Sequence, residues 1–379
     1  MSSNIAYVGI SFDMPGKYDG HLGPFNQSSH IIQLVHPYLQ ETLSKALNCS
    51  QSSASWSQYK SVVKCLESLE RESGISFSFP WAETTLISYM VLQAKRGLMM
   101  STVKTYLSRI RAAHRFRGYK MVESDWTHML YKGLSVIGKT NVPRLAMTPD
   151  KMILLKERLS MSTWRGEKRR LFWMACCFAF HGSLRSAEYL PQAQDNCNPA
   201  NTLLVKDVKS ETFMVNNTQV NAISMVLKEP KELKTHKSRS SLELFETQDF
   251  MCPFNAYNKY VSYMNKKNKP LVALNPLFML NNMGYTRKLF NSDIQFLLSN
   301  DIDYSKGKLL SHSFRSGLAT AMARSGFSQE QIMLVGRWTS DSYLNYIKQG
   351  RSARFETMRQ ISLKMTELSR TWSPGTVVV

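Results

Sequence analysis

The sequence predicts a mainly α-helical protein with a small antiparallel β-sheet, divided into two domains. Its 379 residues exceed the roughly 100–200 residues that one domain usually takes. Hydrophobic residues make up 43% of the chain, which is enough to form packed cores. Along most of the chain they recur at spacings of three and four, as on one face of a helix. Residues 202–245 are β-rich instead.

The first domain is predicted to be a helical module over residues 29–140. Residues 1–28 are punctuated by glycines and are expected to form an N-terminal arm. Apolar stripes within the module predict three helices, namely one from Ser52 that Gly74 ends, one over Glu83–Arg96, and one that begins at Ser101. The module is expected to end near Gly138.

The second domain is predicted over residues 147–350, after a linker at residues 141–146. Its predicted elements, in chain order, are a helix starting at Thr148-Pro149-Asp150, a buried helix containing Leu171–Phe180, strands at Ile223–Val226 and Ser241–Phe245, and helices after Pro253. This order places the small sheet between two helical segments.

Residues 351–379 are predicted to form a C-terminal helix and tail that contact other protomers. Five apolar residues at spacings of three and four support the helix, namely Phe355, Met358, Ile361, Met365 and Leu368. A helix that packs on its own domain would show the same stripe, so both arrangements stay open.

The chain is strongly basic. It has 48 Lys and Arg residues against 28 Asp and Glu residues, which leaves a net charge of +20 at pH 7. Such a surface attracts polyanions, and nucleic acid is a common one in a cell, although ribosomal and structural proteins share this charge. No apolar run reaches the roughly 20 residues of a membrane span, and no secretory signal is recognised. We therefore expect an intracellular protein that binds nucleic acid.

One stretch concentrates the positive charge. No acidic residue occurs between Thr84 and Val122. Eight basic residues in this stretch are the predicted DNA-binding residues: Lys95, Arg96, Lys104, Arg109, Arg111, Arg115, Arg117 and Lys120. A solvated helix face normally mixes both signs because like charges repel, whereas phosphates neutralise a face of one sign. A solvated face is the alternative interpretation.

The six cysteines do not indicate a metal site. None is spaced as CxxC, and no pair of histidines follows at zinc-finger spacing. Cys176 and Cys177 fall in the apolar helix and are expected to be small buried side chains. The remaining cysteines are expected to be free thiols in a reducing compartment.

Residues suited to phosphoryl transfer gather near the C-terminus. His312 and Arg315 are three residues apart, and so on one face of a predicted helix. Trp338 follows in a Gly-Arg-Trp triplet, and Tyr346 comes eight residues after it. A tyrosine can attack phosphorus, and a histidine can handle the proton of the nucleophile.

Three residues from earlier in the chain complete this set. Arg185 precedes Glu188 by three residues, and Lys234 lies in the turn between the two predicted strands. Two arginines can clamp a phosphodiester, and a lysine can protonate the leaving 5′ oxygen. These segments lack the acidic ligands of a two-metal nuclease, so the sequence favours phosphoryl transfer without a metal.

The block His312–Lys348, HSFRSGLATAMARSGFSQEQIMLVGRWTSDSYLNYIK, resembles the C-terminal signature of the tyrosine recombinase (phage-integrase-like) superfamily. It carries HxxR, then GRW in place of the commoner LGH, then the tyrosine. Arg185 with Glu188 matches the first arginine box of the family, and Lys234 matches its β-hairpin lysine. The likeness covers about residues 50–350 and is greatest to recombinases of eukaryotic DIRS/Ngaro and Crypton-type elements and to Cre-like enzymes. STVKTYLSRIRAAHRFRG also resembles the DNA-facing helix of the family's SAM-like core-binding domain.

The resemblance implies a C-shaped clamp on double-stranded DNA and no cofactor. It implies a catalytic set of Tyr346 as nucleophile with Arg185, Lys234, His312, Arg315 and Trp338, supported by Glu188. The tyrosine would form a 3′-phosphotyrosyl intermediate, and strands would exchange through a four-way junction in a tetramer built from site-bound dimers. Such a protein would be nuclear in a eukaryote, and otherwise cytoplasmic with the nucleoid.

Alternatives stay open for the function, the nucleophile and the lysine. A type IB topoisomerase shares this chemistry, and a DNA-binding protein descended from a recombinase would share the residues without cutting. Tyr343 competes with Tyr346 for the role of nucleophile, but only Tyr346 has the family's spacing of eight residues from the tryptophan. Lys231 and Lys237 lie beside Lys234 in the same predicted turn and have the same chemistry.

Overall fold

The chain separates into two compact units, Met1–Asn141 and Val142–Val379, here called unit 1 and unit 2. A computed structural model describes residues 33–49, 53–77, 80–116, 119, 121, 123–138, 142–228 and 240–347. The predicted arm over residues 1–28, the predicted tail over residues 351–379 and the turn that contains Lys234 lie outside the described residues.

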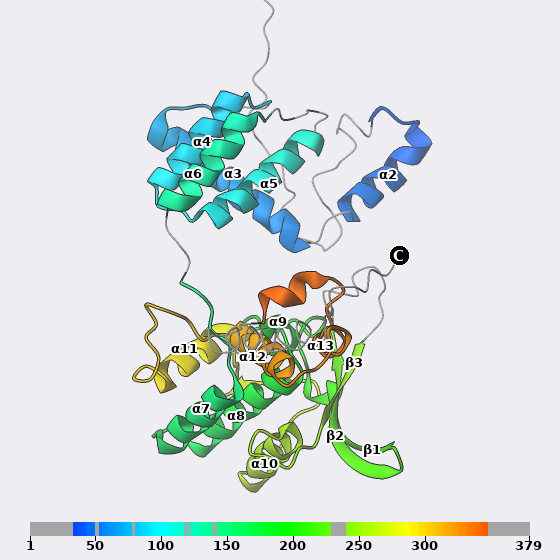
Figure 1. The fold of residues 1–379 in the computed structure, drawn as a ribbon. Coiled ribbons are helices and arrows are strands. Elements are labelled where there is room, and N and C mark those ends of the chain that lie inside the picture. Colours follow the sequence, from blue (N-terminus) through cyan, green and yellow to red (C-terminus); the bar gives the residue numbers. More distant parts are fainter. Residues whose placement is uncertain are drawn as a thin grey trace, which may run out of the picture. The chain divides into compact units, whose positions relative to one another are not determined.

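Unit 1 is built from helices (Figure 1). Its described helices are α2 (Pro37–Cys49), α3 (Ser53–Ser73), α4 (Glu83–Lys95), α5 (Met100–Phe116) and α6 (Asp125–Ile137). The three predicted helices correspond to α3, α4 and α5, and residues of each predicted stripe are buried: Val62, Leu66 and Leu69; Leu86 and Met90; Val103, Leu107 and Ile110. Gly74 follows α3 with a φ of +69°, a conformation that glycine adopts without strain.

Unit 2 packs its helices around α8, with a small sheet on one side. Its described helices are α7 (Pro149–Met161), α8 (Gly166–His181), α9 (Ser186–Tyr189), α10 (Pro253–Lys266), α11 (Arg287–Leu297), α12 (Ser311–Arg324) and α13 (Gln329–Gly336), with short 3₁₀ turns η1 (Val205–Asp207) and η3 (Asp341–Asn345). Every residue from Leu171 to Phe180 is buried, which confirms the predicted core helix. This helix contacts both α10 and α12.

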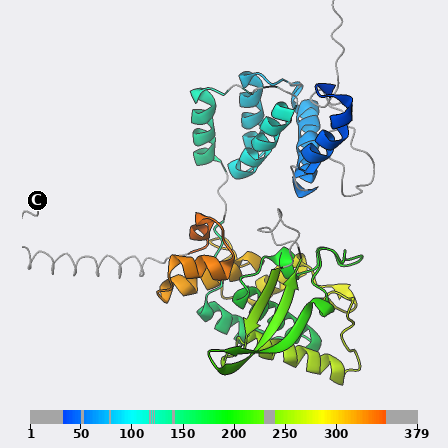
Figure 2. The same ribbon diagram turned by 90° about the vertical axis from the view of Figure 1, so that its right-hand side faces the viewer.

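Three antiparallel strands form the sheet, in the order β1-β2-β3. They are β1 (Val208–Val215), β2 (Thr218–Leu227) and β3 (Ser240–Phe245), and a separate pair consists of β4 (Met279–Leu280) and β5 (Met283–Gly284). Met225 of β2 is paired with Val208 on one side and Leu242 on the other. Figure 2 shows the three strands side by side, with helices of unit 2 behind them. Both predicted strands are confirmed within β2 and β3.

Backbone contacts hold α12 against the segment that enters unit 2. The Leu145 N–H donates to the Lys308 carbonyl at 2.9 Å, and the Met147 N–H donates to the Ser313 carbonyl at 2.8 Å. Gly317 permits this approach, because a Cβ there would lie 1.9 Å from the Met147 carbonyl oxygen. The second half of the predicted linker therefore packs on unit 2 and fixes the start of α12.

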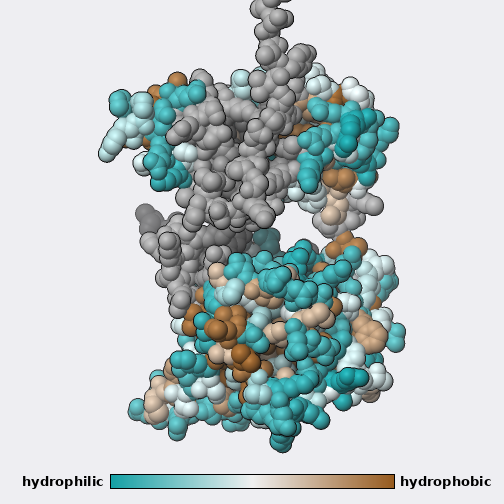
Figure 3. Space-filling model, turned by 180° about the vertical axis from the view of Figure 1, so that it is seen from behind, coloured by the Kyte–Doolittle hydropathy of each residue, from teal (hydrophilic) through white to brown (hydrophobic). Residues whose placement is uncertain are grey.

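The described residues also give information on membrane-spanning helices, metal sites and disulfides. No described helix is long and apolar enough to cross a bilayer, and no group of three or more His, Cys, Asp or Glu side chains among the described residues is placed to hold a metal. Cys176 and Cys177 are fully buried, as predicted. Free thiols are found at Cys65, Cys176, Cys177, Cys197 and Cys252. Seen from behind, the described surface of unit 2 is mostly hydrophilic, with one group of hydrophobic side chains (Figure 3).

Candidate active site

The loop between α8 and α9 presents Arg185 through a contact with Glu188. The Arg185 backbone N–H donates to Glu188 Oε2 at 2.8 Å, and Arg185 Nη1 donates to Glu188 Oε1 at 3.0 Å. Glu188 is buried in the first turn of α9. Because one carboxylate binds both ends of the same residue, it fixes the direction of the Arg185 side chain. The predicted pair is thus present and lies in the candidate site.

Arg315 of α12 is completely buried, and neutral groups hold it. Its Nη1 donates to the Ser183 carbonyl and its Nη2 to the Gly336 carbonyl, each at 2.5 Å. Its guanidinium carbon lies 4.2 Å from the centre of the Trp338 ring. No described carboxylate forms an ion pair with it, and its Nε has no hydrogen-bond partner among the described residues. A buried charge in this state is costly unless a ligand pairs with it.

Arg337 is a site residue that the sequence analysis missed. Its Nη2 donates to Glu188 Oε2 at 2.8 Å, and its Nη1 donates to the Gly182 carbonyl at 2.9 Å. It ends α13 in the left-handed conformation, with a φ of +54°, which is uncommon outside glycine, asparagine and aspartate. The Gly-Arg-Trp triplet is a visible signal, but the family pattern assigns a role only to its tryptophan. Arg337 shares Glu188 with Arg185, so it helps to fix that carboxylate.

Trp338 and Tyr346 face the Arg315 guanidinium. The ring centres of Trp338 and Tyr346 lie 5.2 Å apart, and the Arg315 guanidinium carbon lies 5.6 Å from the centre of the Tyr346 ring. Gly336 makes room for the indole, because a Cβ there would lie 1.6 Å from the Trp338 ring. Trp338 is buried, and its indole N–H has no partner among the described residues.

The two competing tyrosines occupy different environments. Tyr343 is buried in a small hydrophobic cluster with Met322, Ile332 and Trp338, which is the position of a packing residue. Tyr346 is half-buried just after η3, and its backbone carbonyl accepts hydrogen bonds from the Ser316 hydroxyl and, at 3.3 Å, from the Thr320 hydroxyl of α12. These bonds tie the Tyr346 backbone to the helix that carries Arg315.

His312 lies in the first turn of α12 and is half-buried. Burial lowers its pKa below the ordinary value of 6.5, and the charges of Arg144, Arg287, Arg315 and Arg185 lower it further. The imidazole is therefore neutral at neutral pH and is able to accept a proton. Its Nδ1 has no hydrogen-bond partner among the described residues.

The centre as a whole is built for an anion. Burial, and then the charge of Arg185, lowers the pKa of the Arg315 guanidinium to about 10, so it remains charged at neutral pH. Four buried nitrogens lack a partner among the described residues: His312 Nδ1, Arg315 Nε, Arg337 Nε and Trp338 Nε1. Each unpaired buried polar group costs about 1–3 kcal/mol. A tetrahedral oxyanion bound among them would remove part of this cost.

The predicted catalytic residues therefore converge, with one exception. Contacts link Arg185 with Glu188, and Arg315 with Trp338 and Tyr346. Arg337 joins Glu188 to the segment that carries Trp338, and His312 lies one turn before Arg315 on α12. Lys234 falls in the segment between β2 and β3, outside the described residues, as do Lys231 and Lys237.

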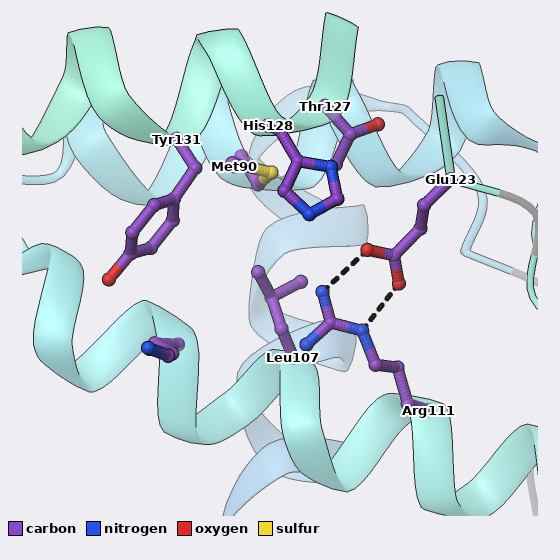
Figure 4. Close-up of a pocket in the computed structure, with 8 residues that line it drawn as sticks. Met90, Leu107, Arg111, Glu123, Thr127, His128 and Tyr131 are labelled. Atoms are coloured by element: carbon purple, nitrogen blue, oxygen red, sulfur yellow. Dashed lines mark hydrogen bonds and ion pairs between the residues drawn. The ribbon is translucent and has the colours of Figure 1, made fainter. Parts of the chain in front are cut away.

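Two of the eight predicted DNA-binding residues of unit 1, Arg96 and Arg111, form ion pairs. Acidic residues from outside the basic stretch fold against it. Arg96 Nη2 lies 2.7 Å from Glu72 Oε1, and Arg111 binds Glu123 through two hydrogen bonds, one of 2.7 Å (Figure 4). Both acidic partners lie outside the acid-free stretch in the sequence, so the composition of that stretch alone did not indicate them.

The other predicted DNA-binding residues are less constrained. Arg109 donates to the Gln58 side chain at 2.9 and 2.6 Å. Lys104 lies 5.8 Å from the centre of the Tyr131 ring, beside a cavity of about 330 Å³ that Arg111 also lines (Figure 4). Lys95 and Arg115 are exposed. Arg117 and Lys120 lie outside the described residues.

Comparison with known proteins places the fold. No protein-family model matches the sequence, and no curated protein matches it. Among solved structures, the XerH site-specific recombinase bound to palindromic difH substrate, in a post-cleavage complex, is similar with a TM-score of 0.54 and 12% identity, over 86% of this chain and 83% of that one. The Tn1549 transposon integrase in complex with transposon right end DNA has a TM-score of 0.51 and 13% identity, over 80% of this chain and 94% of that one.

The lambda integrase dimer bound to a COC′ core site is also similar, with a TM-score of 0.50 and 11% identity. That match covers 84% of this chain and 96% of the other. The three solved proteins are recombinases or integrases, and the predicted fold class is confirmed. The chain has the mainly helical fold, with a small antiparallel sheet, of these three solved structures.

Proposed function

We propose that this protein is a site-specific DNA recombinase or integrase of a mobile element. The observation that carries the proposal is the grouping of Arg185, Arg315, His312, Trp338 and Tyr346 in a centre where four buried nitrogens have no hydrogen-bond partner among the described residues. Solved proteins of similar fold are described as bound to DNA. A phosphodiester is the anion that both observations favour.

In the proposed reaction, the Tyr346 oxygen attacks a DNA phosphorus while the bond from phosphorus to the 5′ oxygen breaks. Neutral His312 accepts the tyrosine proton, and Arg185 and Arg315 bind the non-bridging oxygens, where negative charge increases in the transition state. Lys234 donates a proton to the leaving 5′ oxygen. Attack by a 5′-hydroxyl of a partner strand on the 3′-phosphotyrosine reverses these steps and rejoins the DNA.

The wider assembly belongs to the same proposal. A dimer binds each DNA site, and two dimers form the tetramer in which strands pass through a four-way junction. Exposed cations of unit 1, including Lys95, Lys104 and Arg115, contact the DNA backbone. These contacts release counterions, so log K for DNA falls with log salt by about 0.9 for each phosphate neutralised.

The test begins with the DNA target. Fragments that bind the full-length protein are selected from random DNA, and two copies of the selected site are placed on a supercoiled plasmid. The proposal predicts inverted or excised plasmid products that require two sites and are lost in Tyr346→Phe. Relaxation from a single site without recombinants would indicate a topoisomerase instead. Binding without any covalent protein–DNA adduct would indicate a DNA-binding protein that no longer cuts.

A further inference from the structure

A second group of cations lies in unit 2, apart from the candidate active site. A cavity of about 330 Å³ opens between α7, α8 and α10. Four basic residues line it, namely Lys156, Arg169, Arg170 and Lys259. Figure 1 shows α10 at the opposite end of unit 2 from α9 and α13, which carry active-site residues. The cavity is therefore a separate feature of this unit.

No described residue forms an ion pair with any of these four cations, and they lie together around one cavity. Elsewhere in the unit, Arg158 pairs with Asp301 at 2.5 Å and Lys168 pairs with Asp293 at 2.8 Å. The helix α10 contains no acidic residue, and no carboxylate lines the cavity. Like charges gathered in this way repel one another unless an anion lies between them.

Aromatic rings hold two of the cations in place. Lys156 Nζ lies 4.3 Å from the centre of the Trp173 ring, and the Arg170 guanidinium carbon lies 4.3 Å from the centre of the Tyr263 ring. Such contacts orient a cation without neutralising its charge. Burial lowers the pKa of Lys156, and the nearby charges of Lys259 and Arg170 lower it further. Lys156 and Arg170 are thus oriented by aromatic rings, and no described carboxylate pairs with either.

We propose that this cavity binds a small ligand that carries two or more phosphate groups. Arginine and lysine are the side chains that bind phosphate oxygens. The volume lies at the small end of ligand cavities, which span roughly 300–1,000 Å³. Cations from three helices surround one hollow, an arrangement that fits a compact polyanion better than the convex backbone of a duplex. Trp173 is only 6% exposed, so it offers no face on which a base could stack.

Tripolyphosphate is a suitable probe, and the inference is independent of the proposed recombinase function. It is titrated calorimetrically into the full-length protein at constant ionic strength. The double variant Lys156→Gln/Arg170→Gln should bind it at least about tenfold more weakly, because two charge-assisted contacts are lost. Lys266→Gln removes an exposed lysine of α10 that does not line the cavity, and it should bind like the wild type. Equal affinities of the wild type and the double variant would contradict the proposal.

Two further variants distinguish this cavity from the candidate active site and from a DNA contact. Lys259→Gln changes an exposed residue at the rim and keeps the fold, and it should weaken binding by about threefold. In an Arg185→Gln background, which alters the candidate active site, the double variant should weaken tripolyphosphate binding by the same factor as in the wild type. If Arg185→Gln alone abolished binding, tripolyphosphate would bind at the candidate active site, and the inference would be refuted. Loss of duplex DNA affinity in the double variant, with tripolyphosphate affinity intact, would make the cavity a DNA contact and also refute it.

Discussion

The two units of this chain hold their arginines differently. In unit 1, the Arg111 guanidinium is partly exposed and Glu123 binds it through two hydrogen bonds. In unit 2, Arg315 is fully buried, and it is held by two backbone carbonyl groups and by the Trp338 ring. A carboxylate neutralises the cation that it binds, whereas carbonyl groups and aromatic rings leave the charge available. Arg111 and Arg315 therefore differ in how much of their charge is left for a ligand.

The largest effects are expected at the two arginines that are proposed to bind the phosphate. Arg185→Gln and Arg315→Lys should each lower the rate of DNA cleavage by about 10²–10³, because each removes a donor directed at charge that develops on the phosphate. DNA binding should persist, since it depends on many phosphate contacts. Single-turnover cleavage and gel-shift affinity are measured on the same samples, with thermal unfolding as a control for folding. Cleavage at the wild-type rate by either variant would show that the changed arginine does not stabilise the transition state.

A smaller effect is expected at Arg337, which acts through Glu188. Arg337→Gln should lower the cleavage rate by about tenfold at saturating DNA, since it removes one charge-assisted hydrogen bond that positions Arg185. Glu188→Gln should have a similar effect, and the double variant should be little worse than either single one because they disrupt one network. Fully additive losses would show that Arg337 and Glu188 act independently.

In unit 1, Arg111 has a carboxylate partner and Lys104 has none among the described residues, so their variants should differ in effect. Arg111→Gln breaks the pair with Glu123 and should lower the free energy of unfolding by about 1 kcal/mol, with little change in DNA affinity. Lys104→Gln should do the reverse, leaving stability unchanged while the salt slope of DNA binding falls by about 0.9. Chemical denaturation and binding at several salt concentrations measure both quantities. If both variants lowered the slope of log K against log salt equally, Arg111 would contact DNA despite its ion pair with Glu123.

The smallest expected effect is a pH dependence of stability from His312. Its folded-state pKa lies below the ordinary 6.5, so the unfolded chain binds more protons as the pH falls through this range. The contribution of His312 to stability is present above pH 6.5 and is lost as the pH falls through its folded-state pKa. His312→Gln should therefore show a shallower loss of melting temperature in acid than the wild type. His181 is also buried with a lowered pKa and should keep its own contribution in that variant. Parallel curves for the variant and the wild type would contradict the burial argument.

Local patterns predicted much of the fold and part of the site. The unbroken apolar run of α8 and the stripes of α3 and α5 are local signals, and the structure has these helices. The strand Val208–Val215 was predicted only as part of a β-rich segment, because it lies at one edge of the sheet and most of its residues are exposed or half-buried. Spacing placed His312 and Arg315 on one helix face.

Contacts between distant residues could not be predicted in this way. Arg337 reaches Gly182 and Glu188, which lie 155 and 149 positions away in the chain. The ion pair of Arg96 with Glu72 joins the C-terminal end of α4 to α3. No spacing rule relates such residues, so the acid-free stretch gave no sign of the acidic partners of Arg96 and Arg111. Only the three-dimensional structure shows which basic residues have a carboxylate partner.

The most direct test of the account is the identity of the residue that becomes linked to DNA. A nicked DNA substrate that loses a short fragment after cleavage traps the covalent adduct, and peptide mapping locates the attachment. The account predicts a 3′-phosphate on Tyr346, no adduct in Tyr346→Phe, and an undiminished adduct in Tyr343→Phe when that variant stays folded. Attachment at Tyr343, or an adduct that persists in Tyr346→Phe, would contradict it.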